Sequence, residues 1–133
     1  MESHPDLPVS GDIEELVLRV VASAQEVHDK VGAGMPAEAY GHFLEIELNK
    51  RGCNVKRNVR KPIVYDGSQT DEFYTIDMLV DDCLVLGVQA ADIILPTHKH
   101  RLLTFLKHGG YEIGLLINFN EVNLQDGIIR VIN

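Results

Sequence analysis

Cysteine is scarce in this sequence, which holds only Cys53 and Cys83, far apart in the chain. A disulfide framework or a zinc knuckle needs more cysteines, or cysteines at closer spacing. The pair therefore argues against both kinds of site. It is typical of two reduced, partly buried thiols in a cytoplasmic protein, because the cytoplasm keeps thiols reduced.

Long hydrophobic runs are also missing. No apolar segment approaches the roughly 20 residues that a membrane-spanning helix needs. The first segment, residues 1–12, is acidic and contains prolines, and it has neither the basic start nor the apolar centre of a signal peptide. We therefore predict that residues 1–12 form a flexible arm and that the protein is cytoplasmic, with no membrane partner.

Positive charge is limited, since 12 Lys and Arg stand against 20 Asp and Glu, for a formal net charge of −8. Proteins that bind phosphate backbones usually carry a basic face, so the charge disfavours nucleic acid as a partner. One dense basic stretch runs from Lys50 to Lys61. It is either the solvated side of a helix end and an edge strand or a local nucleic-acid patch. The residues of that patch would be Lys50, Arg51, Lys56, Arg57, Arg60 and Lys61.

The chain of 133 residues suits one domain with its own core, which we assign to residues 13–133. Apolar residues recur at helical spacing over residues 13–31 and predict a first helix. Two glycines within residues 32–34 end it. A proline in the first turn and a glycine after the last turn bound a second helix over residues 36–51.

Three strands are expected next, over residues 55–65, 72–80 and 83–90. Pro62 interrupts the first of them, which suits a position at the edge of a sheet. The Asp66-Gly67 pair begins a turn. These strands form an antiparallel meander.

A third helix, over residues 97–107, leads to a nearly continuous apolar run at residues 112–119. Such a run is typical of a central strand that is covered on both faces. A short strand at residues 128–132 follows, which gives the order α-α-β-β-β-α-β-β. A meander followed by a crossover helix predicts an α/β (α+β) fold with a mixed β-sheet flanked by helices.

Local strings spread over the predicted domain carry a family resemblance. They are EVHDKVGAG at 26–34, Tyr40, LNKRG at 48–52, TIDMLV at 75–80, HRLLTFLK at 100–107, GLLINF at 114–119 and DGIIRVIN at 126–133. Together they resemble the GxxExxY family of the PD-(D/E)XK nuclease superfamily. The resemblance implies the PD-(D/E)XK core and metal-assisted cleavage of phosphodiesters.

In that family a strand Asp and the Glu of an E-x-K motif bind Mg²⁺. The metal lowers the pKa of its bound water, while the Lys orients the nucleophile and offsets developing charge. Residues i and i+2 of a strand project from the same face, so the Glu and the Lys both reach the metal.

This sequence departs from that set at most positions. The metal-binding Asp corresponds to Asp77, but the Glu and Lys of E-x-K correspond to Gly87 and Gln89. The Glu of the GxxExxY signature corresponds to Ala37, and a Gln of the following helix corresponds to Arg101. Mg²⁺ usually takes about six oxygens and more than one carboxylate. We therefore expect no cofactor and no intact catalytic set, and Arg101 can pair with Asp77 in the place of the metal.

A migrated site is the alternative reading of the same residues. Asp77, Asp92 and Glu38 would then hold Mg²⁺, and Lys99 or Lys107 would replace the missing lysine. On a helix Glu38 points about 100° away from the neighbouring signature position, so it would have to shift to reach the metal.

The histidines near the third helix invite a metal site as well. His98 and His100 would lie about 200° apart on a helix and cannot share one ion. We expect His98 and His28 to be packing or capping residues.

Three functional hypotheses follow. The first is a catalytically inactive nuclease-fold protein that acts through protein–protein contact, mainly as a homo-oligomer or scaffold. The second is a nucleic-acid-binding pseudo-nuclease that uses the basic stretch. The third is an active Mg²⁺-dependent nuclease with the migrated site.

Overall fold

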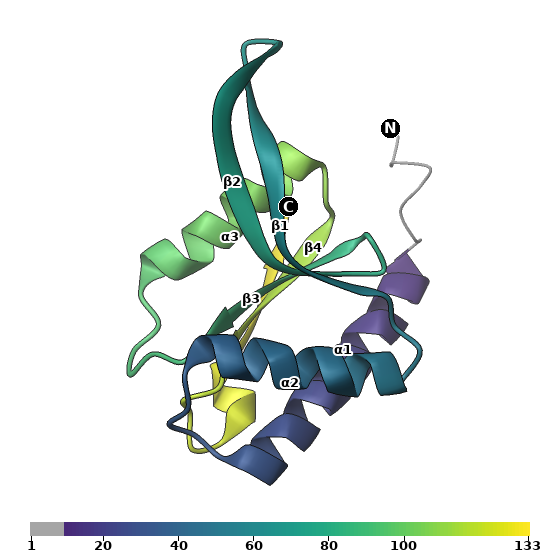
Figure 1. Ribbon diagram of the computed structural model, residues 1–133, viewed down its shortest axis with the longest axis vertical. Coiled ribbons are helices and arrows are strands. Elements are labelled where there is room, and N and C mark those ends of the chain that lie inside the picture. The colour runs from purple at the N-terminus through teal and green to yellow at the C-terminus, as the bar shows by residue number, and fades with distance from the viewer. Residues whose placement is uncertain (1–9) are drawn as a thin grey trace.

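A computed structural model describes residues 10–133, and Figure 1 shows how their helices and strands are arranged. In chain order the elements are α1 (Ser10–Val31), α2 (Ala37–Lys50), β1 (Val55–Tyr65), β2 (Ser68–Val80), β3 (Leu84–Gln89), α3 (Pro96–Gly109), β4 (Ile113–Asn118), the 3-10 helix η1 (Leu124–Gly127) and β5 (Ile128–Ile132). The predicted order of helices and strands is confirmed. The short η1 helix was not predicted.

The strands form one mixed sheet in the order β1-β2-β3-β4-β5. The β3 and β4 strands are parallel and are connected through α3, whereas the other neighbouring pairs are antiparallel. The β1 strand lies at one edge of the sheet, as Pro62 predicted. The predicted fold class is confirmed by this topology.

Helices cover both faces of the sheet (Figure 1). The α1 and α2 helices bury residues such as Val20 and Leu44 against one face. The α3 helix buries Leu102 and Leu106 against the other. Every residue of β4 is buried, which agrees with the prediction of a central strand covered on both sides.

The outer part of the β1–β2 hairpin extends beyond the other three strands of the sheet. Asp66 and Gly67 both have positive φ, 52° and 78°, the combination of a two-residue type I′ turn, and Tyr65 pairs with Ser68 across it. The β3 strand pairs only with residues 78–80 of β2. The outer part of the hairpin therefore projects from the body as a two-stranded arm (Figure 1).

Most boundaries lie within two residues of the predictions, and two differ by more. The α1 helix begins at Ser10, so residues 10–12 of the predicted arm are helical, and residues 1–9 lie outside the described residues. The β2 strand begins at Ser68 and not at Glu72. Pairing across the tight turn continues the strand through polar residues that show no apolar alternation, so their sequence gave no strand signal.

Tyr40 closes the turn between α1 and α2. Its hydroxyl donates to the Gly32 carbonyl (2.5 Å) and accepts from the Met35 amide (3.1 Å). Its ring stacks on Phe119, with the ring centroids 4.6 Å apart. Gly32 and Gly34 have positive φ (84° and 102°) and end α1 as predicted. This arrangement fixes the start of α2 relative to the end of β4.

Both cysteines are buried and unpaired, which confirms the prediction of two reduced thiols. No helix within residues 10–133 is both long enough and apolar enough to cross a bilayer.

Candidate functional site

Asp77, Gly87, Gln89 and Arg101 line one cavity of about 140 Å³ between the sheet and α3. The first comes from β2, the next two from β3 and the last from α3. The fold thus brings together four positions that the sequence singled out. Thr75, Leu86, His98, Leu102, Phe105 and Leu116 complete the lining.

The β3 strand places Gly87 and Gln89 on the same side. Val85 belongs to the core beneath α3, whereas Leu84 and Leu86 belong to the core beneath α1 and α2. Alternate residues of a strand project from opposite faces, so Gly87 and Gln89 share the α3 side with Val85. The predicted geometry of the E-x-K spacing is present, although neither chemical group is.

Asp77 is half-buried, and its Oδ2 atom accepts a hydrogen bond from the Val88 amide at 3.0 Å. Burial raises the pKa of the Asp77 carboxyl because it penalises the charged form, while the Val88 amide and the charge of Arg101 act in the opposite direction. The carboxylate is therefore held where its charge is unfavourable, which is common at functional sites.

The predicted pairing of Arg101 with Asp77 is wrong. No ion pair joins these two side chains among the residues that the structure describes. Arg101 is an exposed residue at the rim of the cavity that Asp77 also lines, and its charge acts on Asp77 without an ion-pair contact. The Val88 amide makes the direct contact instead.

Gly87 lies close to β4. A Cβ atom on Gly87 would lie 3.1 Å from Cδ1 of Leu116, which is closer than ordinary van der Waals contact. Leu116 has filled part of the space that a side chain at this position would need. A larger residue can enter only if the end of the Leu116 side chain moves.

Ala37 opens onto a second cavity, of about 170 Å³, on the α2 side of Asp77. Glu38 and Asn58 line it together with Asp77. Ala37, the position that the resemblance matches to the signature Glu, therefore lies on the opposite side of Asp77 from Arg101. In this chain Ala37 contributes a methyl group and no ligand.

The migrated site is not assembled. Glu38 shares the second cavity with Asp77, but Asp92 lines neither cavity and accepts a hydrogen bond from Asn120 Nδ2 at 3.0 Å. Lys99 lines neither cavity either, and the same is true of Lys107. Within residues 10–133 no group of three His, Cys, Asp or Glu side chains is placed to hold a metal ion.

Comparison with protein families matches residues 14–131 to the PD-(D/E)XK nuclease superfamily. The chain belongs to that superfamily. Neither the curated proteins nor the solved structures give a significant match.

Two histidines of this PD-(D/E)XK domain, His98 and His28, have structural partners. Nδ1 of His98 accepts from the Leu95 amide at 2.9 Å and caps the start of α3. Nε2 of His28 contacts the Glu121 carbonyl at 2.7 Å. Both predictions of packing or capping histidines are confirmed.

Two of the four cations in the strand part of the basic stretch, Lys56 and Arg57, lie beside acidic side chains. The Lys56 ammonium lies 2.8 Å from Asp82, and the Arg57 guanidinium lies 3.6 Å from Glu45. Exposed pairs of this kind are individually weak. They nevertheless reduce the positive potential that this stretch would offer to a phosphate backbone.

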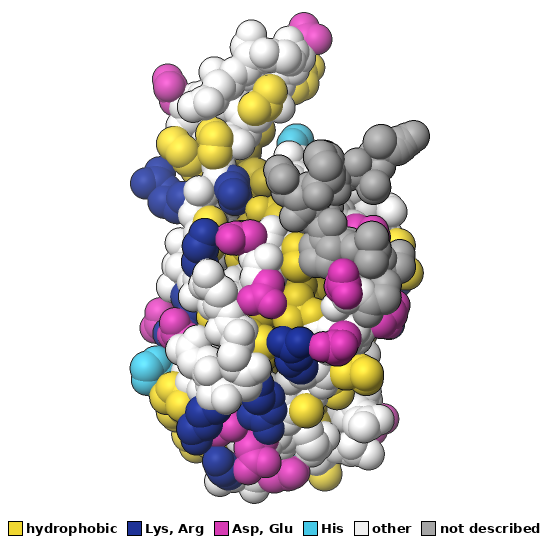
Figure 2. All heavy atoms as spheres, turned by 90° about the vertical axis from the view of Figure 1, so that its right-hand side faces the viewer, with side chains coloured by type: hydrophobic (Ala, Val, Ile, Leu, Met, Phe, Trp, Pro, Cys, Tyr) yellow, Lys and Arg dark blue, Asp and Glu magenta, His cyan; other side chains and the backbone are white. Residues whose placement is uncertain are grey.

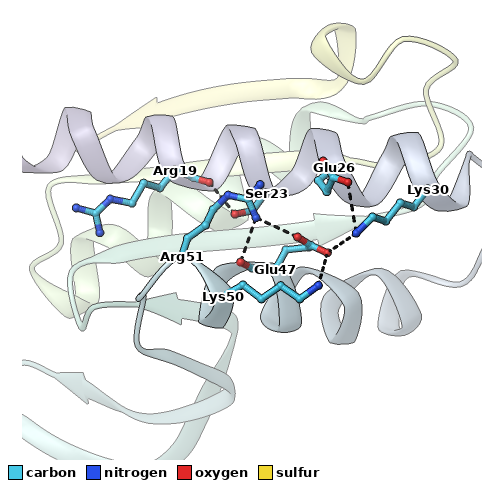
Figure 3. Close-up of polar contacts among 7 residues, drawn as sticks. All are labelled: Arg19, Ser23, Glu26, Lys30, Glu47, Lys50 and Arg51. Carbon is cyan, nitrogen blue, oxygen red and sulfur yellow. Dashed lines mark hydrogen bonds and ion pairs between the residues drawn. The ribbon is translucent and has the colours of Figure 1, made fainter.

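The helix end of the basic stretch forms an ion network around Glu47, which Figure 3 shows. Lys30, Lys50 and Arg51 lie 3.1, 3.5 and 3.0 Å from its carboxylate oxygens. The Glu47 side chain is only 9% exposed. The Arg51 and Lys30 contacts lower the pKa of Glu47. The prediction placed Lys50 and Arg51 on the solvated side of a helix end and missed this acidic centre, which Lys30 of α1 also contacts.

Asn118 is a residue that sequence reasoning missed. It is fully buried at the end of β4. Its amide accepts from the Ala91 amide (3.0 Å) and donates to the Ala91 carbonyl (2.9 Å). It thereby holds the β3–α3 loop, which positions α3 over the cavity. The signal was a single polar residue inside the apolar run GLLINF.

Proposed function

We propose that this PD-(D/E)XK domain is a GxxExxY-type member with a degenerate site, a non-catalytic protein that acts through contact with further copies of itself. The proposal of a degenerate, non-catalytic site is supported by the few side chains of the cavity that could bind a metal ion. Asp77 is its one carboxylate, and Gly87 and Gln89 occupy the E-x-K positions. These groups do not fit Mg²⁺, which usually takes more than one carboxylate.

Polar groups of the cavity also oppose the chemistry of cleavage. One oxygen of Asp77 is already engaged by the Val88 amide. Gln89 carries no charge that could orient a hydroxide or balance charge on a phosphate. Arg101 could attract a phosphate, but without a metal-bound water no nucleophile is generated at neutral pH.

Catalysis is tested by hydrolysis of single- and double-stranded DNA and RNA with Mg²⁺ or Mn²⁺. We expect cleavage no faster than that of an Asp77→Ala variant prepared in the same way. Cleavage that requires Asp77 would overturn the proposal and favour the migrated-site nuclease.

The proposal of self-association is supported by the surface. Most of the basic side chains that could bind nucleic acid lie beside acidic partners. Exposed apolar side chains remain on the projecting hairpin, among them Tyr65 at 77% exposure. Exposed aromatic residues of this kind are enriched in protein interfaces.

Self-association is tested by light scattering behind a sizing column over a wide range of concentrations. We expect a mass above that of the 14.8 kDa chain that rises with concentration. A single subunit at every concentration would refute it. Salt-sensitive binding of DNA or RNA would then favour the nucleic-acid alternative.

A further inference from the structure

The cavity between the sheet and α3 contains polar groups that the proposed function does not use. Helix α3 lies on the opposite face of the sheet from α1 and α2 (Figure 1). The volume of the cavity, about 140 Å³, is close to that of a cavity of about 150 Å³ that can hold benzene. A molecule of about six non-hydrogen atoms therefore fits inside, and a slightly larger one fits if part of it lies in the open mouth.

Asp77 offers this cavity a carboxylate oxygen that has no partner. Its Oδ2 atom accepts the hydrogen bond from the Val88 amide. Its Oδ1 atom makes no hydrogen bond or ion pair within residues 10–133. Hydrogen bonds from a charged donor to a carboxylate are stronger than those between neutral groups. The Oδ1 atom is therefore suited to an ammonium group.

Arg101 offers a positive charge at the rim of the same cavity. Most Lys and Arg side chains of the described chain pair with a carboxylate, and Figure 2 shows such side chains beside Asp and Glu on one face. Arg101 takes part in no ion pair within residues 10–133. Its guanidinium group is therefore available to an anionic group, and its fork of N–H donors matches a carboxylate.

His98 adds a neutral donor from the first turn of α3. Its Nδ1 atom accepts from the Leu95 amide at 2.9 Å. A neutral imidazole that accepts at Nδ1 carries its hydrogen on Nε2. His98 lines the cavity together with Arg101, so α3 supplies both a cation and a neutral N–H group to an anionic part of a ligand.

The two charged residues of the cavity together select a dipolar ligand. A simple anion that reached Arg101 would also meet the charge of Asp77, and a simple cation at Asp77 would meet the charge of Arg101. A molecule that carries both charges avoids each repulsion and gains both attractions. The apolar side chains of Leu102, Phe105 and Leu116 form the rest of the wall on which this argument depends, and they suit the hydrocarbon part of such a molecule.

We propose that this cavity binds a small amino acid, with the ammonium group on Oδ1 of Asp77 and the carboxylate on Arg101 and His98. Asp77 is half-buried and Arg101 is exposed, so the ammonium group points inward and the carboxylate lies at the mouth. The ligand is bound and not transformed. This inference goes beyond the proposed function and does not depend on self-association.

The test titrates the protein with two amino acids and with analogues that lack one charge. The probes are L-valine with isovalerate and isobutylamine, and γ-aminobutyrate with butyrate and propylamine. Binding is followed by the NMR signals of the Val88 amide and the Gln89 side-chain amide, which lie at the cavity. We expect at least one of the two amino acids to bind. Its two analogues should bind about tenfold or more weakly, because each lacks a charge-assisted hydrogen bond.

Two variants exchange the preference for the analogues. Asp77→Asn should weaken binding of the amino acid about tenfold or more and strengthen binding of the analogue without the amine, because the repulsion is removed. Arg101→Gln should weaken the same amino acid and favour the analogue without the carboxylate. Lys99→Gln is the matched control, because Lys99 is an exposed cation of α3 that lines neither cavity beside Asp77. Circular dichroism verifies that all three variants fold.

Several results would overturn the inference. Neither amino acid might shift the signals at millimolar concentration, the analogues might bind equally well, or Lys99→Gln might weaken binding as much as Arg101→Gln. Binding of inorganic phosphate in place of both amino acids would show a simple anion site at Arg101 and would overturn it too. None of these results bears on self-association, which the measurement of solution mass tests separately.

Discussion

The backbone amide of Val88 donates to Oδ2 of Asp77 over 3.0 Å. Gly87 and Gln89, the neighbours of Val88 in β3, line the cavity. The carboxylate is thus tied to β3 at the place where a nuclease would supply a second carboxylate and a lysine. The charge of Asp77 therefore affects the stability of the fold as well as the chemistry of the site.

Asp77→Asn should stabilise the protein at neutral pH. Burial raises the pKa of Asp77 in the folded state, so between the unfolded and folded pKa values the folded state binds more protons. The stability that the Asp77 carboxyl contributes is therefore lost as the pH rises from its unfolded pKa to its folded pKa. An Asn side chain keeps an oxygen that can accept the hydrogen bond from the Val88 amide, but it carries no charge.

Urea unfolding at about pH 3 and at about pH 7 measures this effect, since an ordinary Asp titrates near pH 3.9. We expect the free energy of unfolding to exceed that of wild type only at the higher pH. Asp71→Asn, on the exposed hairpin, is the control. A loss of stability at pH 7 would show that the charge of Asp77 is favourable.

Glu47→Gln should have the opposite dependence. The contacts with Arg51 and Lys30 lower the pKa of Glu47, so its contribution is present above the unfolded pKa and is lost as pH falls through the folded one. We expect the variant to be less stable than wild type near pH 7 and equally stable in acid. The same urea titrations measure it, and equal deficits at both pH values would contradict the ion-network explanation.

Restoring the E-x-K residues should restore metal binding. The variant Ala37→Glu, Gly87→Glu, Gln89→Lys places two further carboxylates around Asp77, from opposite sides of it. We expect Mn²⁺ binding by calorimetry where wild type shows none. The end of the Leu116 side chain must move, because a Cβ atom at position 87 would lie 3.1 Å from its Cδ1 atom.

Metal-dependent cleavage of DNA is the second measurement on the restored variant. The matched control adds Asp77→Ala to the same three substitutions and should bind no metal. A folded variant that binds no Mn²⁺ would mean that the cavity does not place these side chains at the distances that a metal ion needs.

Tyr40→Phe should destabilise the domain by roughly 1–3 kcal/mol, the range for leaving a hydrogen-bond partner unsatisfied. The hydroxyl of Tyr40 serves both the Gly32 carbonyl and the Met35 amide. Tyr65→Phe removes a hydroxyl from an exposed side chain and should change stability by less than about 0.5 kcal/mol. Denaturant midpoints measure both, and equal effects would refute the role assigned to Tyr40.

Cys83 should resist thiol reagents in the folded protein. It is 1% exposed, and burial, with the charges of Asp81, Asp82 and Glu112, raises its pKa to about 11. The reactive thiolate is therefore rare at about pH 8. A Cys53→Ser variant should react with Ellman's reagent at the rate of unfolding. Rapid labelling of the folded variant would contradict this.

Much of the fold could be predicted because its signals are local. The period of the α1 residues, Pro62 at an edge and the unbroken apolar run of β4 each specify their element without its neighbours. The start of β2 could not be predicted, because Ser68 belongs to a strand only through its pairing with Tyr65.

The site was predictable as a set of positions and less so as a set of contacts. The i, i+2 spacing placed Gly87 and Gln89 on one side of β3. It gave no information on whether Arg101 would reach Asp77, because that depends on how α3 lies over the sheet. Asn118 fixes the loop before α3 through Ala91, and a pairing of residues so far apart leaves no local pattern.

The parallel pairing of β3 and β4 has a consequence for synthesis of the chain. β3 gains its second neighbour only after α3 and β4 have emerged from the ribosome, since both follow it in sequence. Until then β3 presents an unpaired edge of apolar residues, and the core beneath α3 has no cover. The nascent chain therefore passes through a stage that is prone to aggregation, and this stage ends when β4 is inserted and β5 pairs along it.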